Sequence, residues 1–516
     1  MFRSTCSYKV AKRSSAYFMG HVSLAKTLHK FMFSFTSITN YHSQLLQGTA
    51  TCEQAVQFYL AQIKCKEHLN AFVELYADEA LAKATALDAG RQAGAPLKKL
   101  HGVVIAIKDV ICYKGHSVTA ASAILQNFRS LYTATALQLL LDEDAIVIGN
   151  CNCDEFAMGS TNENSVYGKV LNALDENKVP GGSSGGSAVA VQADMCMLSM
   201  GSDTGGSVRQ PADFCGIIGV KPSYGQISRY GLLAYASSFD QIGIFGKQLE
   251  DVALLLSLMC KPDERDSTMA QTPARDWSPI ADTAQKKFRF CYFSEAMLHP
   301  SLDKEMQEQM MLLLEELKEA GHTVEAVNFD LMDYVVPAYY VLTTAEASSN
   351  LSRYDGVRYG HQSKLPAKDL NDFYLNNRTE GFGMEVKRRI MLGTFVLSTG
   401  YYDAYYSKAQ KIRALLVRQM TSLFETYDAV IMPTCTQTAF AAGQGQKDPI
   451  AMYMADIYTV LANLTGLGAI SLPLFSHSNN MPFGLQVMTN KADEVTLLEI
   501  SKLLLQQFNK KKLSPN

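Results

Sequence analysis

Two continuously apolar runs, each the length of one strand, most constrain the fold of this chain. Residues 103–107 read VVIAI and residues 145–149 read AIVIG, and a segment with helical periodicity, residues 135–144, leads into the second run. Apolar runs without alternation are typical of strands that are buried on both faces, as in sheets covered by helices. The strand–helix–strand order therefore predicts an α/β sheet whose faces are both covered.

Further elements follow the same rhythm along the chain. A chain of 516 residues exceeds the size at which single cores usually stop growing, about 250–300 residues, so two lobes or one unusually large α/β domain both remain open. We expect helices over residues 51–66, 77–93, 303–319, 402–424 and 495–508, a helix that starts near Ser187, and strands over residues 197–200, 323–327 and 429–432.

Composition excludes several classes of protein. A formal net charge of −3 provides no basic surface of the kind that binds nucleic acid or anionic lipid. Eleven cysteines without a C-x-x-C pair indicate a reducing compartment, and neither a zinc-site spacing nor an H-E-x-x-H motif indicates a metal. Apolar runs of about 18 residues are missing from the sequence, so we expect no membrane span.

The first residues allow two interpretations. Acidic residues are absent before Glu53, while Lys, Arg, Ser and Thr are frequent, which is typical of a mitochondrial transit peptide. The alternative, which we favour, is a start assigned too early, with Met32 as the true first residue. Residues 1–36 are therefore predicted to be an extension outside the folded domain, and residues 509–516 a frayed tail.

Two loops rich in glycine and serine are the strongest functional signal. Residues 180–187 read PGGSSGGS, and residues 201–211 read GSDTGGSVRQP. Such loops are costly to order, because glycine loses more conformational freedom than any other residue. Proteins use them where backbone N–H groups must approach a ligand or a reacting oxygen, although a pair of tight turns beside a sheet is the simpler alternative.

Lys108 directly follows the apolar strand at residues 103–107. Desolvation there favours a neutral amine, which can serve as a base, whereas an ion pair with Asp109 at the edge of the sheet is the ordinary alternative. A serine nucleophile needs such a base, and Ser–Lys pairs are known variants of the catalytic triad. Ser207 is the candidate nucleophile, and Ser183 can relay a proton between Ser207 and Lys108 if the two loops face each other.

The segment before Ser207 supplies a candidate oxyanion hole. Backbone N–H groups of Thr204, Gly205 and Gly206 can converge on a developing negative charge. A rival interpretation makes Ser184 the nucleophile, because residues 182–186 match G-x-S-x-G. That motif requires a preceding strand, and the polar stretch before Pro180 does not predict one. A nucleotide P-loop is also disfavoured, because the G-K-[S/T] ending is missing.

With these residues in view, the chain resembles the amidase signature family. The resemblance covers residues 36–508 and is carried by AIKD at residues 106–109, by both glycine-serine loops, and by the twenty-four positions that separate Ser183 from Ser207. It implies an amidase domain over residues 37–508 with a large mixed twisted sheet covered by helices on both faces. It also implies a Ser–cis-Ser–Lys triad of Ser207, Ser183 and Lys108, with Thr204, Gly205 and Gly206 as the oxyanion hole.

Within the family, the chain is similar to the A subunits of bacterial-type tRNA-dependent amidotransferases. This similarity is carried by DEFAMGS at residues 154–160, SRYGL at 228–232, ASSFDQIG at 236–243 and EVKRR at 385–389. It implies a glutaminase that supplies ammonia to a partner, which converts Glu-tRNA(Gln) to Gln-tRNA(Gln). The implied complex is a heterotrimer with subunits B and C, in which the partner holds the tRNA and uses ATP and Mg²⁺. The implied chain carries no cofactor of its own and lies in the cytoplasm, or in the mitochondrial matrix if residues 1–36 are a transit peptide.

The resemblance also implies a glutamine pocket. Arginine suits the α-carboxylate of glutamine because its fork is bidentate, and a carboxylate suits the α-ammonium. By similarity these residues are Arg389 and Asp456, with Tyr340 lining the pocket. The sequence leaves neighbouring or nearby alternatives open for each role: Arg388, Asp448 and Tyr339.

Two other functions remain to be separated from this one. A stand-alone amidase that hydrolyses small carboxamides needs no partner and has no preference for free glutamine. A catalytically dead scaffold conflicts with the intact set of Lys108, Ser183 and Ser207. Whether Asp-tRNA(Asn) is also a substrate of the complex stays open.

Overall fold

The computed structural model describes residues 33–270, 276–444 and 456–508. Most of the predicted N-terminal extension, the predicted tail and the pocket candidate Asp448 lie outside these residues.

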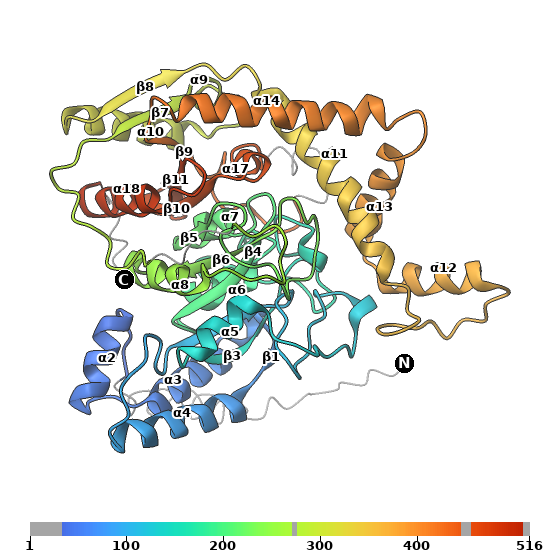
Figure 1. The fold of residues 1–516 in the computed structure, drawn as a ribbon, viewed down its shortest axis with the longest axis horizontal. Coiled ribbons are helices and arrows are strands. Elements are labelled where there is room, and N and C mark those ends of the chain that lie inside the picture. Colours follow the sequence, from blue (N-terminus) through green and yellow to red (C-terminus); the bar gives the residue numbers. More distant parts are fainter. Residues whose placement is uncertain (1–32, 271–275, 445–455, 509–516) are drawn as a thin grey trace, which may run out of the picture.

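Within the described residues, a single mixed sheet of eleven strands runs through the molecule (Figure 1). Its strand order is β1-β3-β2-β4-β6-β5-β10-β11-β9-β7-β8. The strands are β1 (Phe72–Leu75), β2 (Val104–Lys108), β3 (Ile146–Cys151), β4 (Leu198–Asp203), β5 (Ile218–Lys221), β6 (Gln241–Gly246), β7 (Arg289–Phe293), β8 (Thr323–Val327), β9 (Ala429–Pro433), β10 (Gly468–Ser476) and β11 (Pro482–Thr489).

The apolar runs of the sequence form the parallel part of this sheet. β2 lies between β3 and β4 and is parallel to both, and every residue of these three strands is buried. From β4 onward the neighbours pair antiparallel as far as β9, and β7, β8 and β9 are again parallel. The predicted α/β fold with a large mixed sheet is confirmed, as one continuous sheet rather than two lobes.

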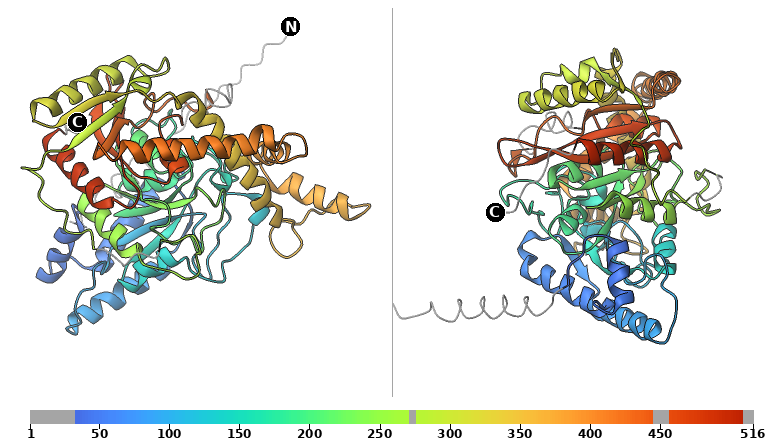
Figure 2. Two further views of the ribbon diagram at one scale, coloured as in Figure 1. Left: turned by 45° about the horizontal axis from the view of Figure 1, so that its top comes forward. Right: turned by 90° about the vertical axis from the view of Figure 1, so that its left-hand side faces the viewer.

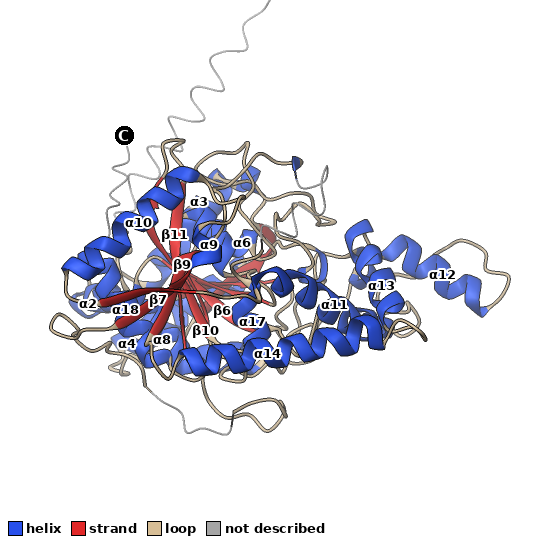
Figure 3. Cartoon of the chain, turned by 90° about the horizontal axis from the view of Figure 1, so that it is seen from above, coloured by secondary structure: helices blue, strands red, loops and turns tan. Residues whose placement is uncertain are grey.

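Helices cover both faces of the sheet (Figure 3), and two further views show the sheet between them (Figure 2). The helices of the described residues are α2 (Ile38–Gln47), α3 (Cys52–Cys65), α4 (Ala77–Gln92), α5 (Thr135–Asp142), α6 (Gly185–Gln192), α7 (Arg209–Cys215), α8 (Leu249–Met259), α9 (Ser294–Met297), α10 (Lys304–Glu319), α11 (Met332–Asn350), α12 (Leu370–Gly381), α13 (Met384–Val396), α14 (Lys408–Leu423), α17 (Val460–Thr465) and α18 (Glu494–Gln507).

Local sequence explains where several helices begin. α3 starts after Thr51, whose hydroxyl accepts from the Gln54 amide while the Gln54 side chain accepts in return, a capping box. α10 starts after the N-cap Asp303. The helix expected near Ser187 begins two residues earlier, at Gly185, and the side chain of the residue before it, Ser184, makes no capping hydrogen bond. The long helix expected from residue 402 starts with a π-helical turn, Asp403–Ser407, before α14.

An arm of three helices extends from one end of the molecule. α11 leaves the body, α13 packs along it, and α12 lies at the tip, on the right in Figure 1. α11 carries Tyr340 and α13 carries Arg389, so the base of the arm brings predicted pocket residues to the body of the molecule.

Candidate active site

Lys108 is the last residue of β2 and is fully buried among hydroxyl groups. Its Nζ donates to Ser183 Oγ at 2.6 Å, to Ser184 Oγ at 2.9 Å and to Ser202 Oγ at 2.9 Å. Burial lowers the pKa of Lys108 to about 8, because the charged form is desolvated. The ordinary alternative, an ion pair with Asp109, is wrong, since that carboxylate accepts from Thr119, Ala121 and Asn150 instead.

Ser183 and Ser184 lie where the first glycine-serine loop enters α6, and the Gly182–Ser183 peptide bond is cis. Ser184 is fully buried, and its hydroxyl donates to the Ser202 carbonyl at 3.0 Å while it accepts from Lys108. A strand does not precede it among the described residues, because the chain from β3 to α6 holds only a short 3-10 turn. The alternative that made Ser184 an elbow nucleophile is therefore disfavoured by burial and by topology.

Asp203, at the end of β4, holds the second glycine-serine loop in shape. Its carboxylate accepts from the N–H groups of Gly206 at 2.9 Å and Val208 at 3.1 Å, on either side of Ser207. The fully buried guanidinium of Arg209 donates to the same carboxylate at 2.9 and 3.1 Å. Burial alone raises the pKa of a carboxyl, but the Arg209 charge outweighs it and keeps the pKa of Asp203 well below its usual range.

The Asp203 contacts do not involve the Ser207 hydroxyl or several backbone N–H groups of the loop. Within the part of the chain that the structure describes, the hydroxyl of Ser207 and the N–H groups of Thr204, Gly205 and Ser207 have no hydrogen-bond partner. Ser207 is 8% exposed, whereas Ser183 and Ser184 are fully buried. Of the three predicted oxyanion-hole residues, Gly206 differs, because its N–H already donates to Asp203.

The three predicted pocket residues lie together beside this loop. The Tyr340 hydroxyl donates to Asp456 Oδ2 at 2.9 Å, and the Arg389 guanidinium lies 5.5 Å from the centre of the Tyr340 ring. Burial raises the pKa of Asp456 to about 6. Thr459 joins this group to the loop, since its hydroxyl donates to the Gly205 carbonyl at 2.6 Å.

The structure separates the alternatives that it describes. The side chain of Arg389 is 4% exposed and that of Arg388 is 46% exposed, so Arg389 is the arginine that faces the pocket. Tyr339 has a different position, because a Cβ added to Gly205 would lie 2.3 Å from its hydroxyl. Tyr339 therefore packs on the oxyanion segment, whereas the Tyr340 hydroxyl donates to Asp456.

Three further residues hold the pocket and were not anticipated. Ser160 donates to both oxygens of Asp456 at 3.1 Å. Glu385 accepts from Arg389 Nε at 2.9 Å, and the Tyr235 hydroxyl accepts from Arg389 Nη1 at 2.8 Å. Ser160 and Glu385 stand inside motifs that carry the family resemblance, and Tyr235 directly precedes one, but nothing in the sequence assigns them to this pocket.

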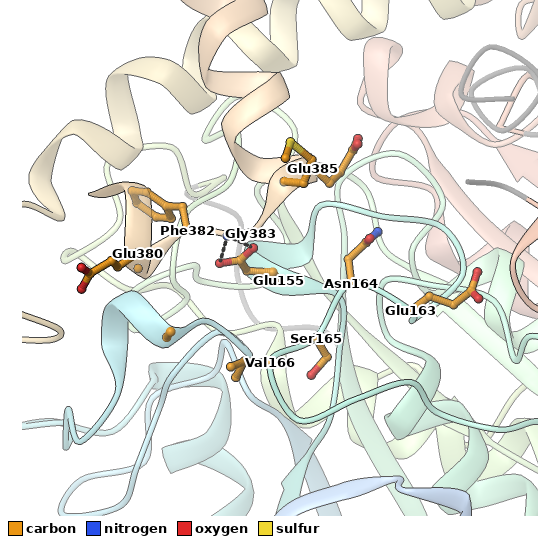
Figure 4. Close-up of a pocket in the computed structure, with 12 residues that line it drawn as sticks. Glu155, Glu163, Asn164, Ser165, Val166, Glu380, Phe382, Gly383 and Glu385 are labelled. Carbon is orange, nitrogen blue, oxygen red and sulfur yellow. Dashed lines mark hydrogen bonds between the residues drawn. The ribbon is translucent and has the colours of Figure 1, made fainter. Parts of the chain in front are cut away.

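A cavity of about 260 Å³ lies next to the pocket, between the 155–166 segment and the turn from α12 to α13 (Figure 4). Glu155 crosses it and accepts from the Gly383 N–H at 2.9 Å, which ties the arm to the body. Glu385 lines the same cavity and also pairs with Arg389. The cavity thus borders the pocket through Glu385.

In the described residues, groups of three or more His, Cys, Asp or Glu side chains suited to a metal ion do not occur. Of the helices described, none has the length and apolar character needed to cross a bilayer.

The chain belongs to the amidase family, whose sequence profile, described as Amidase, matches residues 54–498. Among named proteins, it is 45% identical to the A subunit of the glutamyl-tRNA(Gln) amidotransferase of Chlorobium phaeobacteroides, over 91% of this chain and 98% of the relative. It is 46% identical to the protein of the same name from Koribacter versatilis, over 88% and 94% of the two chains. The crystal structure of the A subunit of the glutamyl-tRNA(Gln) amidotransferase of Thermotoga maritima superposes with a TM-score of 0.73 at 36% identity, covering 89% of this chain and 93% of that one.

Proposed function

We propose that this chain is the glutamine-hydrolysing subunit of a glutamyl-tRNA(Gln) amidotransferase. The single observation that carries the chemistry is a fully buried lysine amine 2.6 Å from the Ser183 hydroxyl. Beside it lies the loop of Ser207, whose own N–H has no partner among the residues that the structure describes. The names of relatives that align with nine tenths of the chain support the assignment to this subunit.

The reaction begins with Ser207. Its hydroxyl oxygen attacks the side-chain carbonyl carbon of glutamine, while Ser183 takes the Ser207 proton and passes its own proton to the neutral amine of Lys108. The negative charge that forms on the carbonyl oxygen is stabilised by the N–H groups of Thr204, Gly205 and Ser207. The proton returns by the same route to the leaving nitrogen, ammonia departs, and water then hydrolyses the glutamyl ester to glutamate.

The pocket selects free glutamine. Arg389 pairs with the α-carboxylate and Asp456 with the α-ammonium, and Tyr340 closes the pocket between them. Because Asp456 and Arg389 are both held by buried partners, they are oriented before the substrate arrives.

Ammonia then passes to the partner subunits B and C, which hold Glu-tRNA(Gln) and use ATP and Mg²⁺ to amidate it. An exposed apolar face on the arm supports such an assembly. Exposed apolar side chains follow one side of α13 and the turn after it: Met384, Met391, Leu392, Phe395, Tyr401, Tyr402 and Tyr405. Contiguous exposed apolar patches of this kind mark protein interfaces. Free cysteines throughout the described residues support a reducing compartment, which we take to be the cytoplasm.

The test is to purify the chain with candidate B and C subunits and to measure glutamine hydrolysis and Gln-tRNA(Gln) together. We expect glutamine-dependent amidation that requires ATP and all subunits. Broad hydrolysis of small amides by the chain alone, with no preference for the α-amino acid group, would instead identify a stand-alone amidase.

A further inference from the structure

We propose that Asp240 is a positioning residue that holds the oxyanion segment, residues 204–207, in register with the arginine that binds the substrate carboxylate. This inference rests on the proposed glutaminase function and concerns a residue to which that chemistry assigns no role.

Asp240 joins two separate segments of the chain. It directly precedes β6, whose first residue pairs with Asp203 at the end of β4. The Thr204 hydroxyl donates to Asp240 Oδ1 at 2.7 Å, which ties the start of the oxyanion segment to this carboxylate. The N–H groups of Tyr235 and Ala236 donate to Asp240 Oδ2 at 2.9 and 3.0 Å, which ties the 235–240 turn to it as well.

The turn reaches the substrate pocket through Tyr235. The Tyr235 hydroxyl accepts from Arg389 Nη1 at 2.8 Å, and its ring lies 5.5 Å from the Arg389 guanidinium. Tyr235 and Asp240 are both buried, so neither contact competes with bulk water. A continuous chain of hydrogen bonds and backbone therefore runs from Thr204 through Asp240 and Tyr235 to Arg389.

Catalysis explains why such a link is useful. Arg389 binds the α-carboxylate of glutamine, and the reacting carbonyl oxygen at the other end must lie about 3 Å from the oxyanion donors. An error of about 1 Å in this spacing is enough to cost about 100-fold in rate. A single carboxylate that orders both segments fixes the spacing between them. It also makes turnover depend on the α-carboxylate, because Arg389 cannot hold a substrate that lacks this group.

The experiment measures kcat and KM in the complete complex for glutamine and for 4-aminobutanamide, which lacks the α-carboxylate. The variants are Asp240→Asn, Thr204→Val, Thr204→Ser and Tyr235→Phe, with Thr465→Val as the matched control. Thr465 is also a buried threonine whose hydroxyl donates a hydrogen bond, but the acceptor is the Leu461 carbonyl in α17.

We expect Thr204→Val to lower kcat for glutamine by about tenfold or more with little change in KM, because the oxyanion segment loses its tie. Thr204→Ser keeps the hydroxyl and should recover most of the rate, while Tyr235→Phe should mainly raise KM for glutamine. Asp240→Asn should reduce the preference for glutamine over 4-aminobutanamide by about tenfold, a ratio that a general loss of folded protein does not move.

A glutamine preference within about twofold of wild type in folded Asp240→Asn would overturn the proposal. If Asp240→Asn does not fold, the Thr204 and Tyr235 variants decide, and rates equal to the Thr465→Val control in both would overturn it. Failure of the underlying function is distinguishable, because it appears in the wild-type complex as an absence of glutamine hydrolysis.

Discussion

Lys108 is the residue on which the chemistry depends. Its hydrogen bonds, among the described residues, go to three serine hydroxyls and to no carboxylate. A buried ammonium without an ion-pair partner is costly, and the neutral amine is correspondingly favoured. The same surroundings that make the lysine a poor structural cation make it an available base.

The pKa of Lys108 predicts how glutamine hydrolysis depends on pH. Only the neutral amine accepts a proton, so activity should rise with pH and level off above about 8. Two pH units below this value, about 1% of the amine is neutral, so kcat/KM should fall about tenfold per unit. Steady-state rates between pH 6 and 9 test this, and a flat profile across that range would contradict the assignment of Lys108 as the base.

Asp456 predicts a separate effect on binding. Its carboxylate must be ionised to pair with the α-ammonium, and its pKa is raised to about 6 by burial. Falling pH protonates it, so KM for glutamine should increase below about pH 6. In Ser160→Ala and Tyr340→Phe, which remove donors to the carboxylate, the increase should begin at higher pH. A KM that stays constant down to pH 5 would exclude this role for Asp456.

Among the elements, the turn from β4 into α7 explains the shape of the nucleophile loop. The Asp203 carboxylate accepts from the N–H groups of Gly206 and Val208, and the intervening N–H of Ser207 has no hydrogen-bond partner in the described part of the chain. Asn463, at 3.0 Å, and Arg209 complete the ring of donors around the carboxylate. One buried ion pair, between Asp203 and Arg209, therefore fixes the shape of this loop.

Asp203→Asn should destabilise the protein strongly, because it leaves the buried Arg209 without its counter-charge. We expect the free energy of unfolding to fall by about 3–5 kcal/mol. The control is Asp369→Asn at the exposed N-cap of α12, where Asn and Asp cap about equally well and little change is expected. Urea denaturation of both variants measures this, and equal midpoints would mean that the ion pair contributes little.

The helices and strands also show which parts of the site could be predicted from the sequence. Lys108, Ser183 and Ser207 could be proposed as catalytic residues from the sequence because each stands in a local pattern, an apolar strand or a glycine-serine loop. Ser160 and Tyr235 were not assigned, because they reach the pocket only through the folded sheet: Ser160 contacts Asp456 across 296 residues, and Tyr235 contacts Arg389 across 154 residues. The engagement of Gly206 with Asp203 was also missed, since composition does not say which way an N–H points. The sequence patterns also did not predict β1, β5, β6, β7, β10 and β11, although β5 and β6 are fully buried and β10 and β11 largely so.

At the scale of the whole molecule, the sheet and the arm carry different parts of the proposed site. The sheet holds Lys108 and the nucleophile loop, while the arm carries Arg389 on its inner face and exposed apolar residues on its outer face. A partner that docks on α13 would therefore contact the helix that positions the substrate.

This arrangement predicts that the outer face of α13 is needed for assembly. Met391 is 72% exposed, and Met391→Lys should weaken binding of the B and C subunits by about tenfold or more, because a hydrated charge replaces apolar contact area. Leu46→Lys, at a 71% exposed site on α2 in the body, is the matched control. Equal binding by the two variants in co-purification or titration would place the partner elsewhere.

The most direct measurement is glutamine hydrolysis and tRNA amidation by the complex carrying Ser207→Ala. The variant removes only the nucleophilic oxygen, so glutamine hydrolysis and glutamine-dependent amidation should be abolished, while amidation with added ammonia should remain at the wild-type level. Glutamine hydrolysis that survives in Ser207→Ala would contradict the central claim that this serine is the nucleophile.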